Sequence, residues 1–142
     1  MGAAASDLRT SSVVVLGGYA WPAHHGGDDR GDGDDDGDGG VGGFPGAVAT
    51  AVRYSYGGVT GERRGWELMP PMLQARCCAA AAADSAGFIY VAGGGESMFA
   101  TAECFDTVER YVHGSSAGAA GVWEQMPPMN QRRCGFGMAY SR

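Results

Sequence analysis

The stretch WELMPPMLQARC, residues Trp66 to Cys77, decides the fold of this 142-residue chain because it occurs twice. It returns as WEQMPPMNQRRC, residues Trp123 to Cys134, with nine of its twelve positions identical and no gap. The two copies lie 57 residues apart. Self-similarity at a fixed spacing is typical of proteins built from repeated structural units. The flanking sequence should therefore contain the rest of the unit.

The repeat extends upstream of this phrase. Tyr54 corresponds to Tyr111 at the same spacing of 57 residues. Further upstream, VVVLGG at residues 13–18 is similar to IYVAGG at residues 89–94, but here the spacing is 76 residues. An Asp/Gly-rich stretch at residues 26–43 accounts for most of the 19 additional residues. The first unit therefore carries an insert that the second unit lacks.

Each unit reads as four short strands separated by turns. In the second unit the apolar run of residues 77–83 is followed at once by a turn, and residues 88–94 are aromatic and β-branched before two glycines stop them. Residues 101–112 alternate in part, and residues 121–126 end at Pro127, which cannot continue a sheet ladder. Four short strands repeated in this way are typical of a β-propeller blade.

The order of these features resembles the kelch repeat. The resemblance rests on paired glycines, a Tyr, a Trp and an Arg in each unit, namely Gly17, Gly18, Tyr54, Trp66 and Arg76 in the first and Gly93, Gly94, Tyr111, Trp123 and Arg133 in the second. It implies an all-β fold, a partial β-propeller of two four-stranded antiparallel kelch blades in an incomplete ring. In that architecture the aromatic residues supply contact area between stacked blades, and the glycines allow sharp turns. We expect all ten residues to be structural.

The expected organisation starts with an N-terminal tail over residues 1–10. The first repeat spans 11–72 and lacks its first strand, the second spans 73–129, and one further strand lies within 130–142. That strand either completes the first unit and closes a ring, or begins another blade. Two blades alone leave their outer faces without a neighbour. We therefore expect a piece of a longer propeller, with self-association of two or three chains as the alternative.

Composition narrows the classes of function. The net charge of −6 argues against a protein that neutralises nucleic-acid phosphates, and seven of the sixteen acidic residues lie in the insert, which we expect to be disordered. No apolar run approaches the ~20 residues of a membrane span. The cysteines show no CxxC spacing, and we expect reduced thiols, a cytoplasmic location and neither metal nor cofactor. They are Cys77, Cys78, Cys104 and Cys134.

The loops of a four-stranded meander predict where a partner binds. Loops from the second to the third strand, and from the fourth strand to the next unit, emerge on one side of the sheets. Loops on a rigid scaffold often carry function. We expect Glu96, Met98 and Phe99 in the second unit to contact a partner protein, although Phe99 could instead pack under its own loop.

The kelch resemblance implies a non-enzymatic protein-binding scaffold, such as a substrate-recognition module of a ubiquitin ligase. No Ser-His-Asp or paired-carboxylate pattern predicts a catalytic site. The alternative is the non-catalytic part of a galactose-oxidase-like or sugar-processing propeller enzyme, because such enzymes are also kelch-like. That oxidase chemistry requires copper held by Tyr and His ligands with a cross-linked Cys, and no motif here places those residues together.

Overall fold

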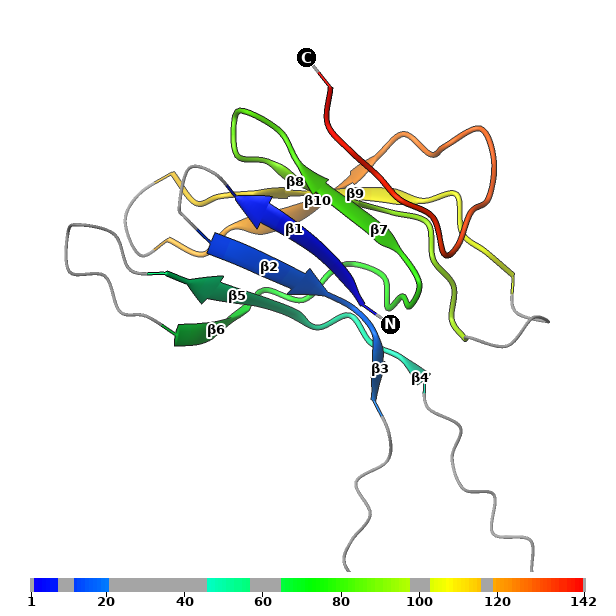
Figure 1. Ribbon diagram of the computed structural model, residues 1–142, viewed down its shortest axis with the longest axis horizontal. Helices are drawn as coiled ribbons and strands as arrows, with labels where there is room; N and C mark the ends of the chain where they lie inside the picture. Colours follow the sequence, from blue (N-terminus) through cyan, green and yellow to red (C-terminus); the bar gives the residue numbers. More distant parts are fainter. Residues whose placement is uncertain are drawn as a thin grey trace, which may run out of the picture.

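The structure, a computed structural model, describes six ranges of the chain, which are residues 2–7, 12–20, 46–56, 65–97, 103–115 and 119–141. Within these ranges every regular element is a strand, and no helix occurs (Figure 1). The expected all-β class is therefore confirmed. The insert at residues 26–43 lies outside the described residues, as do Met98 and Phe99.

The strands form two four-stranded sheets and one short ribbon, with every neighbouring pair antiparallel. The first sheet, in the order β1-β2-β5-β6, contains β1 (Ala3–Asp7), β2 (Ser12–Leu16), β5 (Ala51–Ser55) and β6 (Gly65–Met69). The second sheet contains β7 (Ala80–Ala83), β8 (Ile89–Ala92), β9 (Val108–Val112) and β10 (Val122–Met126), which neighbour one another in chain order. The ribbon pairs β3 (Tyr19–Ala20) with β4 (Gly46–Ala47).

The two sheets are repeats of one structural unit, as their loop hydrogen bonds show. Five backbone hydrogen bonds outside the ladders recur at equivalent positions. Gly17 N donates to Thr50 O at 2.8 Å, for example, and Gly93 N donates to Thr107 O at 3.0 Å. The periodicity of the sequence therefore corresponds to a periodicity of backbone structure.

The first glycine of each pair occupies a position that no other residue fits. Gly17 and Gly93 have φ angles of 63° and 62°, in the left-handed region that favours glycine. A Cβ atom would lie 2.2 Å from Arg76 O at Gly17 and 2.3 Å from Arg133 O at Gly93. The connection to the following unit thus passes directly over each glycine.

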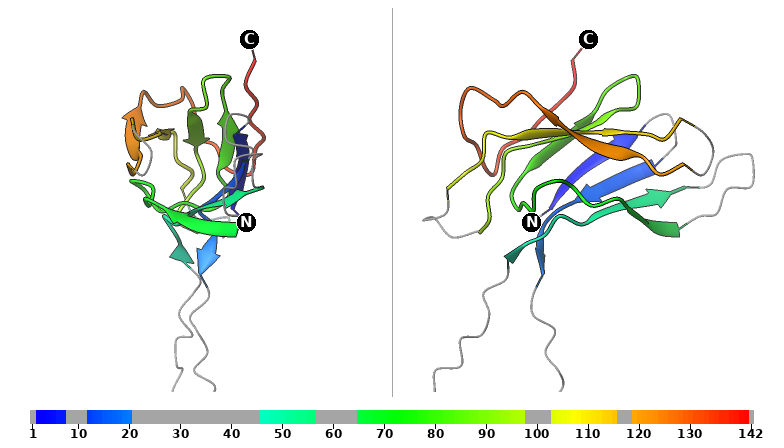
Figure 2. Two further views of the ribbon diagram at one scale, coloured as in Figure 1. Left: turned by 90° about the vertical axis from the view of Figure 1, so that its left-hand side faces the viewer. Right: turned by 180° about the vertical axis from the view of Figure 1, so that it is seen from behind.

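The sheets pack face to face. We call the face that carries the Tyr and Trp of a unit its front face, and the opposite face its rear face. Residues alternate between these faces along each strand. The front face of the second sheet packs against the rear face of the first, and β1 and β7 lie side by side (Figures 1 and 2). Their shared core includes Val14, Leu16, Ala51 and Met69 from the first sheet and Ile89, Val91, Tyr111 and Trp123 from the second.

The aromatic pair of the second unit lies inside this junction. The ring centroids of Tyr111 and Trp123 are 5.3 Å apart, and the two residues are 5% and 7% exposed. Trp123 Nε1 donates a hydrogen bond of 2.8 Å to Pro70 O, in the connection that leaves the first sheet. The equivalent rings of Tyr54 and Trp66 are 5.2 Å apart, but Trp66 is 61% exposed. Among the described residues, a neighbouring sheet covers the second pair and not the first.

The expectation of a first unit without its first strand was wrong. Residues Ala3–Asp7 form β1, which pairs with β2 as β7 pairs with β8. Both strands are rich in alanine, which favours helix by intrinsic propensity. Here the small side chain suits the crowded strand nearest the other sheet, since Ala3 and Ala5 are buried. Tertiary packing therefore overrides the local preference.

The strand expected within residues 130–142 does not form. The described residues 130–141 contain no strand, and most of them are exposed. The closing alternative required this segment to pair with β2, but β1 already occupies that position. The segment instead leaves the second sheet along a path anchored by Arg133, whose N–H donates to Phe105 O at 3.0 Å.

Candidate functional site

The ribbon, the β8–β9 loop and the connection from β6 to β7 lie on one side of the sheets, toward the lower right of Figure 1. Ala47 N, in the ribbon, donates to Glu96 O in the β8–β9 loop at 3.2 Å. Cys77 and Gly95 exchange two backbone hydrogen bonds of 3.0 Å, and Gly95 also bridges to Cys104. Loops from both units and the connection between them therefore form one continuous surface, which we call the loop face.

A shallow pocket of about 350 Å³ opens on the loop face, and Glu96, Ser97, Glu103 and Phe105 line it. It combines two carboxylates with one aromatic ring. Glu103 Oε2 accepts a hydrogen bond from Arg132 Nη1, but these side chains are 83% and 59% exposed. Such an exposed ion pair contributes little stability. The pocket can therefore bind a cationic or hydrogen-bond-donating group by exchanging this contact.

Of the three expected contact residues, the structure places only Glu96. It lies in the pocket and is exposed. Met98 and Phe99 lie outside the described residues. The sequence did not indicate Glu103 and Phe105, because both fall within residues 101–112, which we expected to form a strand. Only Val108–Val112 forms a strand there, and the two residues lie in the loop before it.

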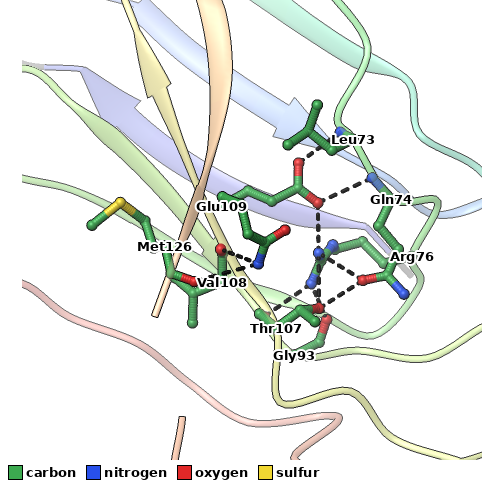
Figure 3. A network of polar contacts seen from close by, with 9 residues as sticks. Leu73, Gln74, Arg76, Gly93, Thr107, Val108, Glu109 and Met126 are labelled. Atoms are coloured by element: carbon green, nitrogen blue, oxygen red, sulfur yellow. Dashed lines mark hydrogen bonds and ion pairs between the residues drawn. The ribbon is translucent and has the colours of Figure 1, made fainter. Parts of the chain in front are cut away.

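A buried ion pair lies between the sheets (Figure 3). Arg76 Nη2 donates to Glu109 Oε1 at 2.6 Å, and both side chains are fully buried. The carboxylate also accepts hydrogen bonds from Leu73 N at 2.7 Å and Gln74 N at 3.1 Å. Glu109, on β9, thereby holds the connection that follows Pro70 against the second sheet.

The Arg76 guanidinium makes several further contacts. Nη1 donates to Gly93 O at 2.7 Å and to Thr107 O at 3.3 Å, and Nη2 donates to Thr107 Oγ1 and Gln74 Oε1, each at 3.2 Å. The ring of Phe105 lies 5.9 Å from the guanidinium carbon. Nε is buried without an acceptor among the described residues. The sequence identified Arg76 as a repeat residue, but it did not identify Glu109, Thr107 or Gln74 as its partners.

The second copy of this arginine has a different environment. Arg133 is exposed, although its Nη2 donates to Gln131 Oε1 at 3.1 Å as Arg76 does to Gln74. The position equivalent to Glu109 in the first sheet is Val52, so a carboxylate is missing there. The arginine and its carboxylate are thus both present at the junction inside the chain. On the outer faces the equivalent residues are Arg133 and Val52, which cannot form an ion pair.

The expectation of four reduced thiols was wrong for two of them, because Cys104 and Cys134 form a disulfide. They lie 30 residues apart in sequence, and the fold brings the β8–β9 loop beside the exit segment. Spacing alone does not reveal such a pairing. Cys77, the repeat equivalent of Cys134, is buried and unpaired, and position 47, which corresponds to Cys104, is Ala.

The two free cysteines lie beside Tyr19. Burial raises the pKa of the Cys77 thiol above its ordinary value, and Cys77 Sγ donates to Gly95 O at 3.1 Å. Cys78 has a φ of 53°, and its Sγ lies 3.7 Å from Tyr19 Oη. Burial likewise raises the pKa of Tyr19. Cys77 and Tyr19 are therefore protonated at neutral pH.

Within the ranges that the structure describes, no group of three or more His, Cys, Asp or Glu residues is arranged to hold a metal ion. The same ranges contain no helix long and apolar enough to cross a membrane. His24 and His25, the adjacent histidines of the first unit, lie outside the described residues.

No protein-family model matches the chain, and the search of curated proteins finds no match.

Proposed function

We propose that this chain is a non-enzymatic, protein-binding scaffold of the kelch β-propeller type. The observation that carries the proposal is the stacking of two sheets of identical topology, front face on rear face, with the ribbon, the β8–β9 loop and the connection between the sheets on one side. A propeller needs this order of sheets to form a rigid frame. Loops on such a frame are well placed for recognition, because their ends are fixed by the strands.

The loop face supplies the proposed contact surface. Glu96 and Glu103 give it negative charge, and Phe105 supplies an aromatic surface next to them. We also propose, from the sequence alone, that Met98 and Phe99 contact the partner. A partner protein that presents Arg or Lys beside an apolar side chain fits this chemistry. The kelch resemblance extends the proposal to substrate recognition in a ubiquitin ligase.

Site-specific photo-crosslinking tests the contact surface. A photoreactive amino acid at Glu96 should trap a discrete partner protein in cells of the source organism. The same group at Ser85 should not, since Ser85 lies in the β7–β8 turn and contacts Tyr140 rather than the loop face. Equal yields at both positions, or no adduct at Glu96, would count against the proposal.

A charge reversal provides the second arm of this test. Glu103→Arg should abolish the adduct formed at Glu96, because it removes one of the two carboxylates of the pocket. Glu67→Arg is the matched control, since Glu67 also forms an exposed ion pair with an arginine, Arg53, but lies on β6. The control should leave the adduct unchanged.

We propose a cytoplasmic location on the basis of the scaffold class. Disulfides persist mainly in oxidising compartments, so the Cys104–Cys134 pair bears directly on this proposal. In a reducing cytoplasm the disulfide seen in the structure should be reduced, so rapid alkylation of intact cells before lysis should label both thiols. Recovery of the pair in its oxidised form would instead indicate an oxidising compartment.

A further inference from the structure

The front face of the first sheet is apolar and has no neighbouring sheet among the residues that the structure describes. Its residues are equivalent to the buried front face of the second sheet, and they are Val13, Val15, Val52, Tyr54, Trp66 and Leu68. Trp66 is 61% exposed and Leu68 is 79% exposed. Trp66 Nε1 makes no hydrogen bond with any residue that the structure describes. We call this surface the free front face.

The other end of the stack carries a complementary surface, the rear face of the second sheet. It is equivalent to the rear face of the first sheet, and that face packs against the front face of the second sheet within the chain. The Arg110–Glu124 ion pair on this surface repeats the Arg53–Glu67 pair at the same strand positions. Near β10 this surface lacks a cover: Met126 is only partly buried, whereas its counterpart Met69 is 7% exposed. We call this surface the free rear face.

We propose that the free front face binds the free rear face of a second copy of this chain, so that sheets continue front to rear across the junction between chains. The junction inside the chain supports this occupant, because it joins the same two kinds of face with the same connecting loops. Head-to-tail contacts of this kind close into a ring or continue as a filament. Two chains would give four sheets and three chains six, both within the range of closed propellers.

The internal junction identifies one contact to expect between chains. Trp123 Nε1 donates to Pro70 O within the chain. The equivalent donor on the free front face is Trp66, and the equivalent acceptor lies in the connection after β10. Trp66 Nε1 should therefore donate to the carbonyl of Pro127 of the partner subunit. This hydrogen bond would satisfy a donor that has no acceptor in the described chain.

The internal junction also identifies a weak point. Arg133 of the partner subunit would enter the place that corresponds to the Arg76 site, where Gly17 O, Thr50 O and Thr50 Oγ1 are the equivalent acceptors. The carboxylate is missing, because Val52 replaces Glu109. A desolvated arginine without its carboxylate is unfavourable. The contact between chains should therefore be weaker than the contact within the chain, and one substitution should strengthen it.

Val52→Glu supplies the missing carboxylate and gives a gain-of-function test. We expect the wild-type chain to associate with a concentration-dependent mass in sedimentation equilibrium, reaching two or three chains. Val52→Glu should lower the dissociation constant by about tenfold or more, as a close interfacial charge pair can. Adding Arg133→Ala to this variant should remove the gain.

Val13→Glu is the matched control. It places the same acidic side chain on the same free front face, but at a position equivalent to Ile89, whose cross-strand neighbour is Tyr111 rather than Glu109. It should weaken association, and circular dichroism should verify that each variant folds. A monomeric mass for both wild type and Val52→Glu at every concentration would overturn the proposal. Weakening by Val52→Glu would also overturn it, because the face would then bind a different surface.

This inference does not depend on a partner at the loop face. The sedimentation results concern the sheet faces, whereas the crosslinking results concern Glu96. A negative sedimentation result would overturn the assembly alone, and a negative crosslinking result would overturn the partner-binding surface alone. The two failures are therefore distinguishable.

Discussion

At the scale of single residues, the buried pair of Arg76 and Glu109 contributes more to the position of a connection than to stability. A buried ion pair adds little net stability compared with apolar residues of similar volume, since both charges lose their hydration. It does fix the position of the connection between the sheets, because the carboxylate binds two backbone N–H groups there. Specificity of packing is therefore the contribution that we assign to it.

Removing one member of this pair should be costly. Glu109→Ala leaves the Arg76 guanidinium buried without its carboxylate, and we expect a loss of about 3–5 kcal/mol in the free energy of unfolding, measured by urea denaturation. The exposed pair of Arg53 and Glu67 provides the control, and Glu67→Ala should cost about 1 kcal/mol or less. A double variant, Arg76→Met with Glu109→Leu, should lose less than Glu109→Ala alone. Equal losses for all three variants would contradict this account.

Cys77 makes stability depend on pH. Burial raises the pKa of this thiol in the folded protein above its ordinary value of 9.0, so the unfolded chain releases the proton first as pH rises. The folded state then binds more protons than the unfolded state, and stability falls with increasing pH in that range. Between about pH 8 and 9.5, the unfolding free energy should fall less steeply for Cys77→Ala than for wild type. Identical slopes would show that the thiol does not contribute.

At the scale of the elements, the two Tyr–Trp pairs show that the same residues at the same strand positions differ in burial when their neighbouring sheets differ. Tyr111 and Trp123 are buried because the first sheet covers them, whereas Tyr54 and Trp66 occupy equivalent strand positions that no described sheet covers. The sequence presents both pairs alike. Only the order of the sheets in space determines which pair stabilises the monomer.

The two tryptophans should therefore respond differently to truncation. Trp123→Ala should lower the unfolding free energy by about 3–5 kcal/mol, since it opens a cavity in the junction. Trp66→Ala should change it by about 0.5 kcal/mol or less in chains dilute enough to be monomeric. Thermal unfolding followed by circular dichroism measures both. A large loss for Trp66→Ala would mean that another part of the chain covers this ring.

Several elements could be predicted from the sequence, and the exceptions have physical causes. The strands from residues 88–94 and 121–126 were confirmed as β8 and β10, because β-branched and aromatic residues end there at glycines or prolines. β1 was missed, since alanine carries no strand signal and only its burial against the neighbouring sheet favours extension. Of the expected strand at 101–112, only β9 forms, and the residues before it contribute to the loop face.

The site was less predictable than the fold for a related reason. Glu96 could be selected because loops on one side of a meander share a surface. The partners of Arg76 and the Cys104–Cys134 disulfide could not, since each joins segments about 30 residues apart, whose contact depends on how connections cross the sheets. Short sequence patterns do not predict which distant segments come into contact.

At the scale of the whole molecule, the ribbon of β3 and β4 pairs the residues on either side of the segment 21–45. Tyr19 pairs with Ala47 and Ala20 with Gly46, so the two residues that flank this segment lie side by side. The ends of the segment between them are therefore held together by the ribbon itself. The stack of sheets should be independent of what this segment contains.

Deletion of residues 26–43 tests that independence. The entropy of closing a loop changes slowly with its length, so we expect the unfolding free energy to change by about 1 kcal/mol or less. Differential scanning calorimetry of the deletion variant and the full chain measures the effect. A decrease of many degrees in the melting temperature would show that the insert supports the sheets.

The close approach of a carbonyl to Gly17 and Gly93 has a consequence for how this chain tolerates mutation. A saturation library selected for folding should accept many residues at Gly137, where an added Cβ meets no atom within 4 Å. The same library should retain glycine alone at positions 17 and 93. Gly94, where a Cβ would lie 2.4 Å from Cys77 O, should behave in the same way, so mutational tolerance at the described glycines follows how closely another backbone segment approaches them.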